Sequence, residues 1–463
     1  MIQGSKLGPI LFNIFINDLL VKLNSTKLGV TIERIQITAL GYADDIVLIA
    51  ETPEKLQALV KICEEWSRKN GMKFSTEKCK VLALNVGTKG LAIKLSGKSM
   101  EAVSQLKYLG IIISRSRLTT LYGRHIEKML EKAETRINVI RHMGYQRDGL
   151  RPEASIRMYK ILVRPILEYA AQVLSYQNYY FTERECAKIQ EPVEFIKKME
   201  SFQNRALKKI ISCPKNTSPA VIRLLTGTMP ITGRMDMLKL RYFWKIDHAT
   251  VENMTHQVYL GLRKNFLKSN KGYIHEVFNL CCKYNRMDIW HGQCPKKINP
   301  LSRIRNIVLD YHLKNDEETA RRVNCIYTRI TVLKAKKYNF EERLTKLDIF
   351  QNTDHRSVFL QALLESDKYE KECRNCEQRV RNFTQHGMEE CKAVEQQRTL
   401  FKMRMKFYDA TEKTSQLKLE DIFNEAMSRK CVMKVVCEFL IVIWNWTCKV
   451  SEYSNKHLYK NRS

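Results

Sequence analysis

The stretch that decides the fold is residues 39–50, Ala39-Leu40-Gly41-Tyr42-Ala43-Asp44-Asp45-Ile46-Val47-Leu48-Ile49-Ala50. Asp44 and Asp45 lie between an alternating apolar run and a nearly continuous one, which predict a half-buried strand and a fully buried strand. Neighbouring side chains of a flat strand point to opposite faces, so a turn is needed to bring both carboxylates to one point. Ala43-Asp44 lacks the Gly or Asn that two-residue turns favour. A broken local rule inside a strong apolar frame predicts a functional site.

The chemistry that two adjacent carboxylates could serve is narrow. They repel each other unless a cation compensates their charge. Mg²⁺ prefers carboxylate, phosphate and water oxygens, and two such ions about 3.5–4 Å apart can activate one oxygen and stabilise the leaving one in phosphoryl transfer. The alternative is an acidic hairpin tip that faces solvent, which is the commoner role of an isolated Asp-Asp pair. The neighbouring segments therefore have to decide between the two.

The segment before the aspartates predicts a turn followed by a helix. Gln3-Gly4-Ser5-Lys6-Leu7-Gly8-Pro9 leads into an apolar segment, and Pro9 suits the first turn of a helix. The helical spacing of the apolar positions predicts one buried stripe, made of Leu7, Ile10, Leu11, Ile14 and Phe15. After the aspartates, Thr52-Pro53-Glu54 predicts the start of a second helix, and Asn70-Gly71 its end.

Four blocks in this part of the chain resemble the polymerases of non-LTR retrotransposons. Tyr42-Ala43-Asp44-Asp45 resembles the catalytic hairpin of reverse transcriptases, and residues 3–19 resemble the block Gln-Gly-Ser-x-Leu-Gly-Pro-x-Leu-Phe-x-x-x-Ile-Asn-Asp-Leu. Residues 72–79 resemble the following block, and Tyr108-Leu109-Gly110-Ile111-Ile112 resembles the primer-grip hairpin. The first helix on its own would be a core helix, and Tyr-Leu-Gly alone an ordinary strand. Their common order makes the resemblance specific.

The resemblance implies a role for each matching residue. By position, Asp44 and Asp45 would be catalytic and hold two Mg²⁺ ions, and Lys78 would protonate the departing pyrophosphate. The residues near the nucleotide and template would be Gln3, Gly4 and Tyr42, and those of the primer grip Tyr108, Leu109 and Gly110. For Lys78 the alternative is a strand-edge lysine that blocks aggregation. Ser75 and Cys79 stand where the family more usually has Asn and Thr.

The family's third catalytic carboxylate comes from a block that lies upstream of Gln3-Gly4, and only Met1 and Ile2 precede that pair here. We therefore expect an N-terminally truncated polymerase with an incomplete site and no DNA synthesis by residues 1–463 alone. A true truncation and a wrongly placed start of the reading frame both remain open.

Basic helices are predicted from Thr119 onward. They cover residues 126–140, 154–174, in which Pro165 forces a kink or break, and 195–211. By resemblance these helices form the thumb, which would contact the nucleic acid; the alternative is that their charges only solubilise the surface. His275, Cys281, Cys282, His291 and Cys294 fit no zinc pattern and are predicted to be core residues.

A second constellation has the spacing Cys-x2-Cys-x9-His-x4-Cys and consists of Cys373, Cys376, His386 and Cys391. Such a set can supply four ligands to one tetrahedral Zn²⁺. The alternative is a group of unrelated reduced thiols, since the chain has 14 cysteines. Polar neighbours favour zinc, because buried structural cysteines prefer apolar surroundings. The pattern also resembles the Cys-Cys-His-Cys knuckle downstream of the polymerase in many non-LTR elements.

Composition agrees with these interpretations. The 463 residues carry a formal net charge of +30, which favours a polyanionic partner such as nucleic acid. The longest apolar run near the end, residues 439–444, is too short to span a bilayer, so no membrane partner is expected. Without a secretion signal, the cysteines are expected to be reduced and the protein intracellular, in nucleus or cytoplasm. The oligomeric state is not predicted.

The predicted fold class is therefore α+β. It comprises the C-terminal half of a polymerase palm (an antiparallel sheet with helices), then a mostly α-helical thumb and a C-terminal region with a small zinc knuckle. The predicted domains are a partial palm at 1–115, a helical thumb-like region at 116–215, a helical region of unknown role at 216–360 and the knuckle region at 361–463. Three functions remain: the C-terminal part of an RNA-directed DNA polymerase acting on RNA template, DNA primer and deoxynucleotides, which is favoured; a non-catalytic nucleic-acid-binding remnant; and a zinc-organised interaction protein.

Overall fold

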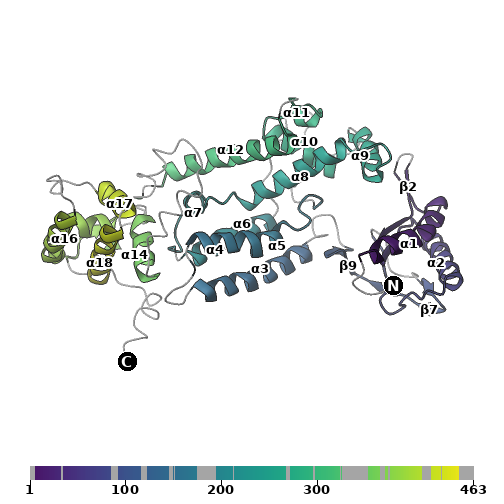
Figure 1. The fold of residues 1–463 in the computed structure, drawn as a ribbon, viewed down its shortest axis with the longest axis horizontal. Coiled ribbons are helices and arrows are strands. Elements are labelled where there is room, and N and C mark those ends of the chain that lie inside the picture. The colour runs from purple at the N-terminus through teal and green to yellow at the C-terminus, as the bar shows by residue number, and fades with distance from the viewer. Residues whose placement is uncertain are drawn as a thin grey trace. The chain divides into compact units, whose positions relative to one another are not determined.

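The structure is a computed structural model. It describes residues 6–32, 35–84, 92–115, 123–144, 150, 152–174, 194–211, 213–266, 272–295, 298–323, 325, 353–364, 371–373, 376–408, 419–428 and 430–447. The chain divides into two compact units. Unit 1 comprises residues 1–128, 173–191 and 239–297, and unit 2 comprises residues 129–172, 192–238 and 298–463. Helices and strands are both present and helices predominate, in agreement with the predicted class (Figure 1).

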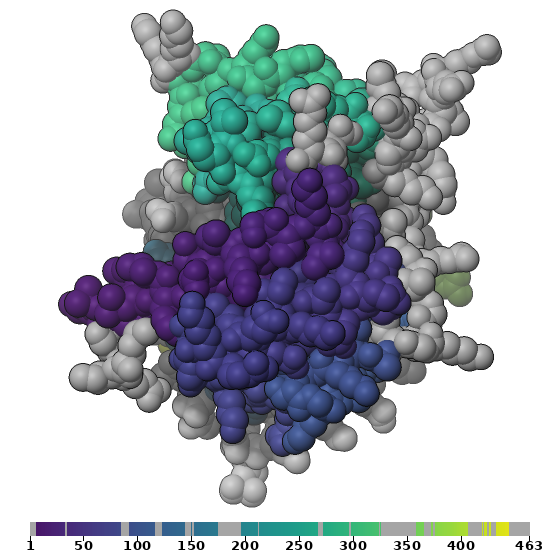
Figure 2. Space-filling view, turned by 90° about the vertical axis from the view of Figure 1, so that its right-hand side faces the viewer, coloured from purple at the N-terminus to yellow at the C-terminus, as the bar shows by residue number. Residues whose placement is uncertain are grey.

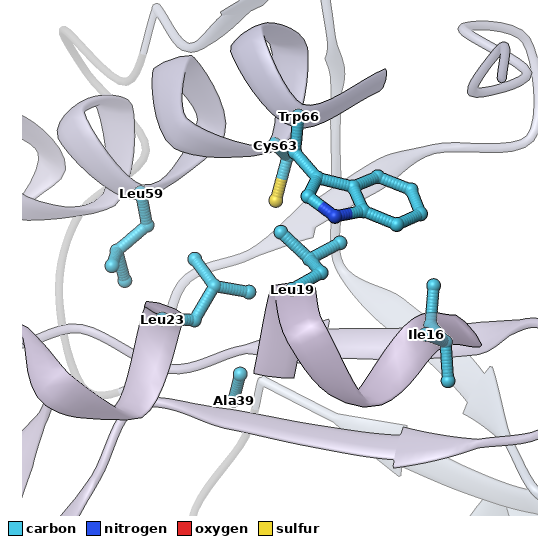
Figure 3. Packing of buried hydrophobic residues seen from close by; sticks show 7 residues of the cluster. All are labelled: Ile16, Leu19, Leu23, Ala39, Leu59, Cys63 and Trp66. Atoms are coloured by element: carbon cyan, nitrogen blue, oxygen red, sulfur yellow. The ribbon is translucent and has the colours of Figure 1, made fainter. Parts of the chain in front are cut away.

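The core of the N-terminal part of unit 1 lies between two helices and a hairpin. Helix α1 (Gly8–Ser25) and helix α2 (Pro53–Lys69) contribute all but one of the buried side chains, and strand β3 (Ala39–Tyr42) contributes the other. Figure 3 shows this cluster, which consists of Ile16, Leu19, Leu23, Ala39, Leu59, Cys63 and Trp66. Trp66 Nε1 donates a hydrogen bond to Asp18 Oδ2 at 3.1 Å and so links the two helices. Helix α2 begins as predicted, because the Thr52 side chain accepts a hydrogen bond from the Lys55 N–H.

The predicted buried stripe of α1 is wrong. Leu7, Ile10 and Ile14 are 63%, 57% and 67% exposed, while Ile16, Leu19 and Leu23 are the buried residues. The helix is apolar on more than one side, so spacing alone did not identify the face that packs. That choice is made by α2 and β3, which cover the Ile16–Leu23 side. Figure 2 shows α1, the darkest purple segment, lying open on the face turned to the viewer.

Every sheet in the described ranges has two strands. The antiparallel pairs are β1 (Val30–Ile32) with β2 (Ile35–Ile37), β3 with β4 (Asp45–Leu48), β6 (Lys94–Leu95) with β7 (Lys98–Ser99), and β9 (Gln105–Tyr108) with β10 (Ile111–Ser114). Strand β5 (Lys80–Leu82) pairs in parallel with β8 (Glu101–Val103), which departs from the predicted antiparallel arrangement. The expected full burial of the run after the aspartates is also wrong: β4 is only half-buried, because β3 is the only strand that pairs with it among the described residues.

The second part of unit 1 is helical and rich in aromatic side chains. Its elements are the end of α8 (Ile231–Asp247), α9 (Met254–Lys264), α10 (Tyr273–Lys283) and α11 (Met287–Trp290). Phe243 stacks on Trp290 with ring centroids 5.9 Å apart, and the Arg263 guanidinium lies 4.7 Å from the Trp290 ring. His275 and Cys281 are buried as predicted, whereas His291 is exposed at the end of α11 because the chain turns there.

The predicted basic helices are present, and most of their residues belong to unit 2. They are α3 (Gly123–Gly144), α4 (Pro152–Met158), the π-helix η1 (Tyr159–Val163), α5 (Arg164–Glu168) and α6 (Glu194–Ile210). The interruption expected at Pro165 is present as η1, where the Arg164 N–H bonds to the Tyr159 carbonyl. Helices α7 (Pro219–Thr226) and α12 (Pro300–Arg321) complete this part.

The end of unit 2 is a helical bundle next to a small hairpin. The helices are α14 (Thr353–Leu364), α16 (Glu395–Tyr408), α17 (Leu419–Ser428) and α18 (Lys430–Thr447). Helix α18 contacts the other three, which explains the apolar run at residues 439–444 (Figure 1). No helix in the described part of the chain is long and apolar enough to cross a membrane.

Candidate active site and metal centre

The two aspartates lie at the tip of a tight hairpin. Strands β3 and β4 pair so that Tyr42 faces Asp45, which leaves Ala43-Asp44 as a two-residue turn. Tyr42, Asp44 and Asp45 are all exposed. The predicted hairpin is therefore confirmed, and both carboxylates are available to solvent and to a ligand.

The turn is strained at Ala43. Its φ is +51°, in the left-handed region that residues with a side chain rarely adopt. Such a conformation costs about 1–2 kcal/mol for a residue other than glycine. It persists where the surroundings hold it in place, and residues of this kind cluster at functional sites.

Helix α1 holds the hairpin in place. Asn24 Oδ1 accepts hydrogen bonds from the N–H groups of Thr38 at 3.3 Å and Ala39 at 3.1 Å, and its Nδ2 donates to the Ala39 carbonyl. A Cβ added to Gly41 would lie 2.8 Å from Leu20 Cδ1, so this glycine lets β3 approach the helix closely. Sequence reasoning missed Asn24, Leu20 and Gly41 as positioning residues, because nothing local marks an interaction across 14 to 21 positions.

The structure contains the second predicted hairpin as well. Strands β9 and β10 are joined by Leu109 and Gly110, whose φ angles of +45° and +81° define the hairpin predicted for this motif. Burial raises the pKa of Tyr108, and the charge of Asp45 raises it further. The Tyr108 side chain therefore lies within electrostatic reach of the first hairpin.

The structure describes one of the other predicted residues and leaves two outside its described ranges. Lys78 lies on an exposed turn before β5, not within the strand. Gln3 and Gly4 lie outside the described residues. In the ranges that the structure describes, no third acidic side chain joins Asp44 and Asp45 in a group that could hold a metal. Two exposed carboxylates at one turn are a donor set that suits Mg²⁺, although they complete only part of its coordination sphere.

The Cys-Cys-His-Cys spacing brings four ligand atoms together. One donor atom from each of Cys373, Cys376, His386 and Cys391 lies within 4.8 Å of all the others. The Cys373 and Cys391 sulfurs are 3.9 Å apart, and Cys376 Sγ is 3.2 Å from His386 Nε2. Two thiolates bound tetrahedrally at about 2.3 Å would be about 3.8 Å apart, so the residues fit Zn²⁺.

Local backbone structure forms this knuckle. Strand β11 (Lys371–Glu372) pairs with β12 (Arg379–Val380), and the Cys373 carbonyl accepts the Glu377 N–H at 2.8 Å in the intervening turn. His386 begins the π-helix η5 (His386–Glu390), whose last bond runs from the Cys391 N–H to the His386 carbonyl at 2.7 Å. Three of the four ligand residues are buried beside Phe383 and Val394. Of the polar neighbours, Glu377, Gln378 and Arg379 are exposed, whereas Asn382 is buried.

The Cys391 thiol of the knuckle is harder to deprotonate than an isolated thiol. Burial raises the pKa of the Cys391 thiol to about 11, and the neighbouring Cys373 contributes. Clustered thiols stay protonated without a compensating charge, whereas a bound metal deprotonates them.

Comparisons with known proteins point to one family for the N-terminal segment. Residues 1–113 match the family model described as reverse transcriptase (RNA-dependent DNA polymerase). The RNA-directed DNA polymerase from mobile element jockey of Drosophila funebris is 31% identical over 178 residues, which is 37% of this chain and 19% of that protein. The Pol polyprotein of the type-1 element R2 of Nasonia vitripennis is 34% identical over 121 residues, covering 24% and 12% of the two chains. That of element R1 2 from the same species is 27% identical over 192 residues, covering 38% and 44%.

The N-terminal segment, residues 1–113, is therefore similar to reverse transcriptases. The relatives it resembles are polymerases and Pol polyproteins of non-LTR retrotransposons. The chain spans less than half of the length of each of these three relatives.

Proposed function

We propose that this chain is the C-terminal part of a retrotransposon RNA-directed DNA polymerase. Its reaction would be template-directed nucleotidyl transfer, with an RNA template, a DNA primer and deoxynucleotides as substrates. The observation that carries the proposal is the strained, exposed hairpin that presents Asp44 and Asp45, within a segment that matches reverse transcriptases. The proposed domains are a palm at residues 1–115, which carries the site, and a helical thumb at 116–215.

In this proposal each site residue has one task. Asp44 is the principal Mg²⁺ ligand with Asp45 beside it, and two bound Mg²⁺ ions would stabilise charge on the reacting phosphate. Lys78 would give a proton to the departing pyrophosphate. Tyr42, together with Gln3 and Gly4, would contact nucleotide and template, and residues 108–110 would hold the primer end.

The two carboxylates that the described residues bring together make an incomplete site. Loss of a group outside the first coordination shell already costs about 10–100-fold, so a missing ligand should cost more. We expect a polypeptide of these 463 residues to extend no primer on an RNA template with Mg²⁺. Robust extension that Asp44→Asn abolishes would contradict this and would mean that another residue of this chain completes the site.

Nucleic-acid binding is proposed for α3 and α6. Arg124, Lys128, Lys132 and Arg136 are exposed on α3, opposite the buried stripe. Each phosphate contact releases counterions, so affinity for a primer–template duplex should fall steeply with salt, and Lys132→Glu with Arg136→Glu should reduce the salt slope by about 1 per lost contact. Binding that is indifferent to salt would refute this function.

We propose that the Cys373–Cys391 knuckle binds one Zn²⁺ ion per chain. Metal analysis of the purified protein should find about one equivalent of zinc, as for a four-ligand structural site, and Cys373→Ser with Cys376→Ser should lose it. An unchanged zinc content would exclude these ligands. We place the protein in a reducing intracellular compartment, where its thiols stay available to the metal.

A second function is favoured by one observation, the absence of a third acidic partner for Asp44 and Asp45 among the described residues. A remnant that binds nucleic acid without catalysis would keep the salt-dependent affinity but show no difference in nucleotide binding between wild type and Asp44→Asn. An interaction protein organised by zinc would show neither salt-dependent binding of nucleic acid nor nucleotide binding that depends on Asp44. Mg²⁺-dependent deoxynucleotide binding that Asp44→Asn weakens would favour the polymerase.

A further inference from the structure

The knuckle does not stand apart from the helices that follow it. Gly387 lies in η5 between His386 and Cys391, and a Cβ added to it would lie 2.4 Å from Ile443 Cγ2 on α18. Gly387 and Ile443 are both buried. The backbone next to two ligand residues therefore packs directly on the central helix of the bundle, and only glycine permits that approach.

A second contact reaches the knuckle from α16. Arg398 donates from Nε and Nη2 to the Gly387 carbonyl at 3.3 and 3.2 Å, and its Nη2 also donates to the Cys391 carbonyl. Buried carbonyls need partners, and this guanidinium supplies them for the segment that carries two of the four ligands. Helix α16 in turn packs on α18, where Phe401 stacks on Phe439 with ring centroids 4.4 Å apart.

The knuckle has little core of its own. Its buried cluster consists of Cys373, Phe383, Cys391 and Val394, so half of its members are ligand residues. A segment of this size cannot supply enough apolar burial to fold alone, and metal binding is then folding free energy. The metal site would hold the backbone of the knuckle in one conformation, and α16 and α18 bury that backbone.

We propose that Zn²⁺ binding and folding of the bundle formed by α14, α16, α17 and α18 are one coupled event, transmitted through Arg398 and Gly387. The knuckle is then an internal clamp on the bundle rather than a separate nucleic-acid-binding module. This rests on the proposed zinc site. Because coupling between two events is reciprocal, substitutions that break the contacts between these helices and the knuckle must weaken zinc binding, just as zinc loss must loosen the helices.

The first test measures amide hydrogen exchange of the full chain with and without a zinc chelator. Chelation should raise exchange throughout residues 395–408 and 430–447 and leave α1 and α2 unchanged. Zinc loss with unchanged exchange in α16 and α18 would overturn the coupling while leaving the zinc site intact. A protein that never binds zinc would overturn both proposals.

The second test measures Zn²⁺ affinity by competition with a chromogenic chelator. Arg398→Met should weaken it by about 10–100-fold, as loss of outer-shell partners does. Arg404→Met is the matched control, since Arg404 also links α16 to α18, through Glu438 at 2.8 Å, without touching the knuckle. Gly387→Ala should weaken binding as well, and adding Ile443→Ala should restore part of it by making room. Equal affinities for all these variants would refute the clamp.

Discussion

Ala43 is the residue at which the hairpin departs most from ordinary backbone geometry. Its φ of +51° is easy for glycine and costly for any residue with a Cβ. We expect Ala43→Gly to stabilise the hairpin by about 0.5–1 kcal/mol, since it removes the strain but adds flexibility to the unfolded chain. Ala43→Val should destabilise it.

Hydrogen exchange of the β3 and β4 amides measures this local opening, because exchange reports sub-global stability where global unfolding of a multi-unit chain does not. Exchange should be slower than wild type in the glycine variant and faster in the valine variant. Faster exchange in both variants would show that Ala43 is held by contacts other than its own backbone preference.

Gly41 and Leu20 are in close contact, and each limits the size of the other. An added Cβ at Gly41 would meet the tip of Leu20 at 2.8 Å, so Gly41→Ala must move either that side chain or the hairpin. We expect Gly41→Ala to reduce Mg²⁺-dependent nucleotide binding at Asp44 and Asp45, and Leu20→Ala to restore part of it in the double variant. If the double variant is no better than Gly41→Ala alone, the contact with α1 does not position the aspartates.

Helix α1 provides the prediction at the scale of the element. Leu19 is completely buried, whereas Ile14 is 67% exposed. Truncating a buried leucine to alanine costs about 2–5 kcal/mol, while an exposed site usually changes stability by less than about 0.5 kcal/mol. Leu19→Ala should therefore greatly lower the urea concentration at which the Trp66 environment is lost, and Ile14→Ala should not. If Ile14→Ala were the more destabilising of the two substitutions, the buried face expected from the sequence would be the correct one.

Local features could be predicted from the sequence, and features that depend on distant packing could not. The Asp44–Asp45 hairpin, the end of α2 and the Cys373–Cys391 cluster were predictable, because turn chemistry, caps and ligand spacing are local properties. Three features were not predictable: the buried face of α1, the half-burial of β4 and the hydrogen bonds of Asn24 to Thr38 and Ala39. Each depends on which distant segment packs there. The effect of Pro165 was predictable only in part. The interruption of the helix followed from the sequence, but the π-helix that forms it did not.

At the scale of the whole molecule, unit 2 is held together by charge as well as by apolar packing. Arg223 on α7 donates to Asp316 on α12 at 2.9 Å from Nε and to Glu200 on α6 at 3.1 Å from Nη1. Both carboxyl groups share this one guanidinium in a largely buried setting. Burial raises the pKa of Glu200 and of Asp316 above their ordinary values, and Arg223 opposes that shift only in part.

The direction of these two pKa shifts predicts how the stability of unit 2 changes with pH. A carboxyl group with a higher pKa in the folded state than in the unfolded state binds its proton more tightly when folded. Its contribution is therefore complete below the ordinary carboxyl pKa and is lost as the pH rises through the raised value. We expect the free energy of unfolding of unit 2 to fall as the pH is raised from mildly acidic towards neutral.

The decisive measurement is the slope of stability against pH, obtained from urea unfolding at several pH values. Glu200→Gln should flatten that slope, because it removes one of the two perturbed carboxyls, even though it also weakens the bond that Glu200 accepts from the Thr232 N–H. Glu395→Gln is the control, since Glu395 is exposed at the start of α16, away from this network. A stability that rises with pH over this range, or equal slopes in wild type and Glu200→Gln, would mean that Arg223 keeps both carboxyls ionised in the folded protein.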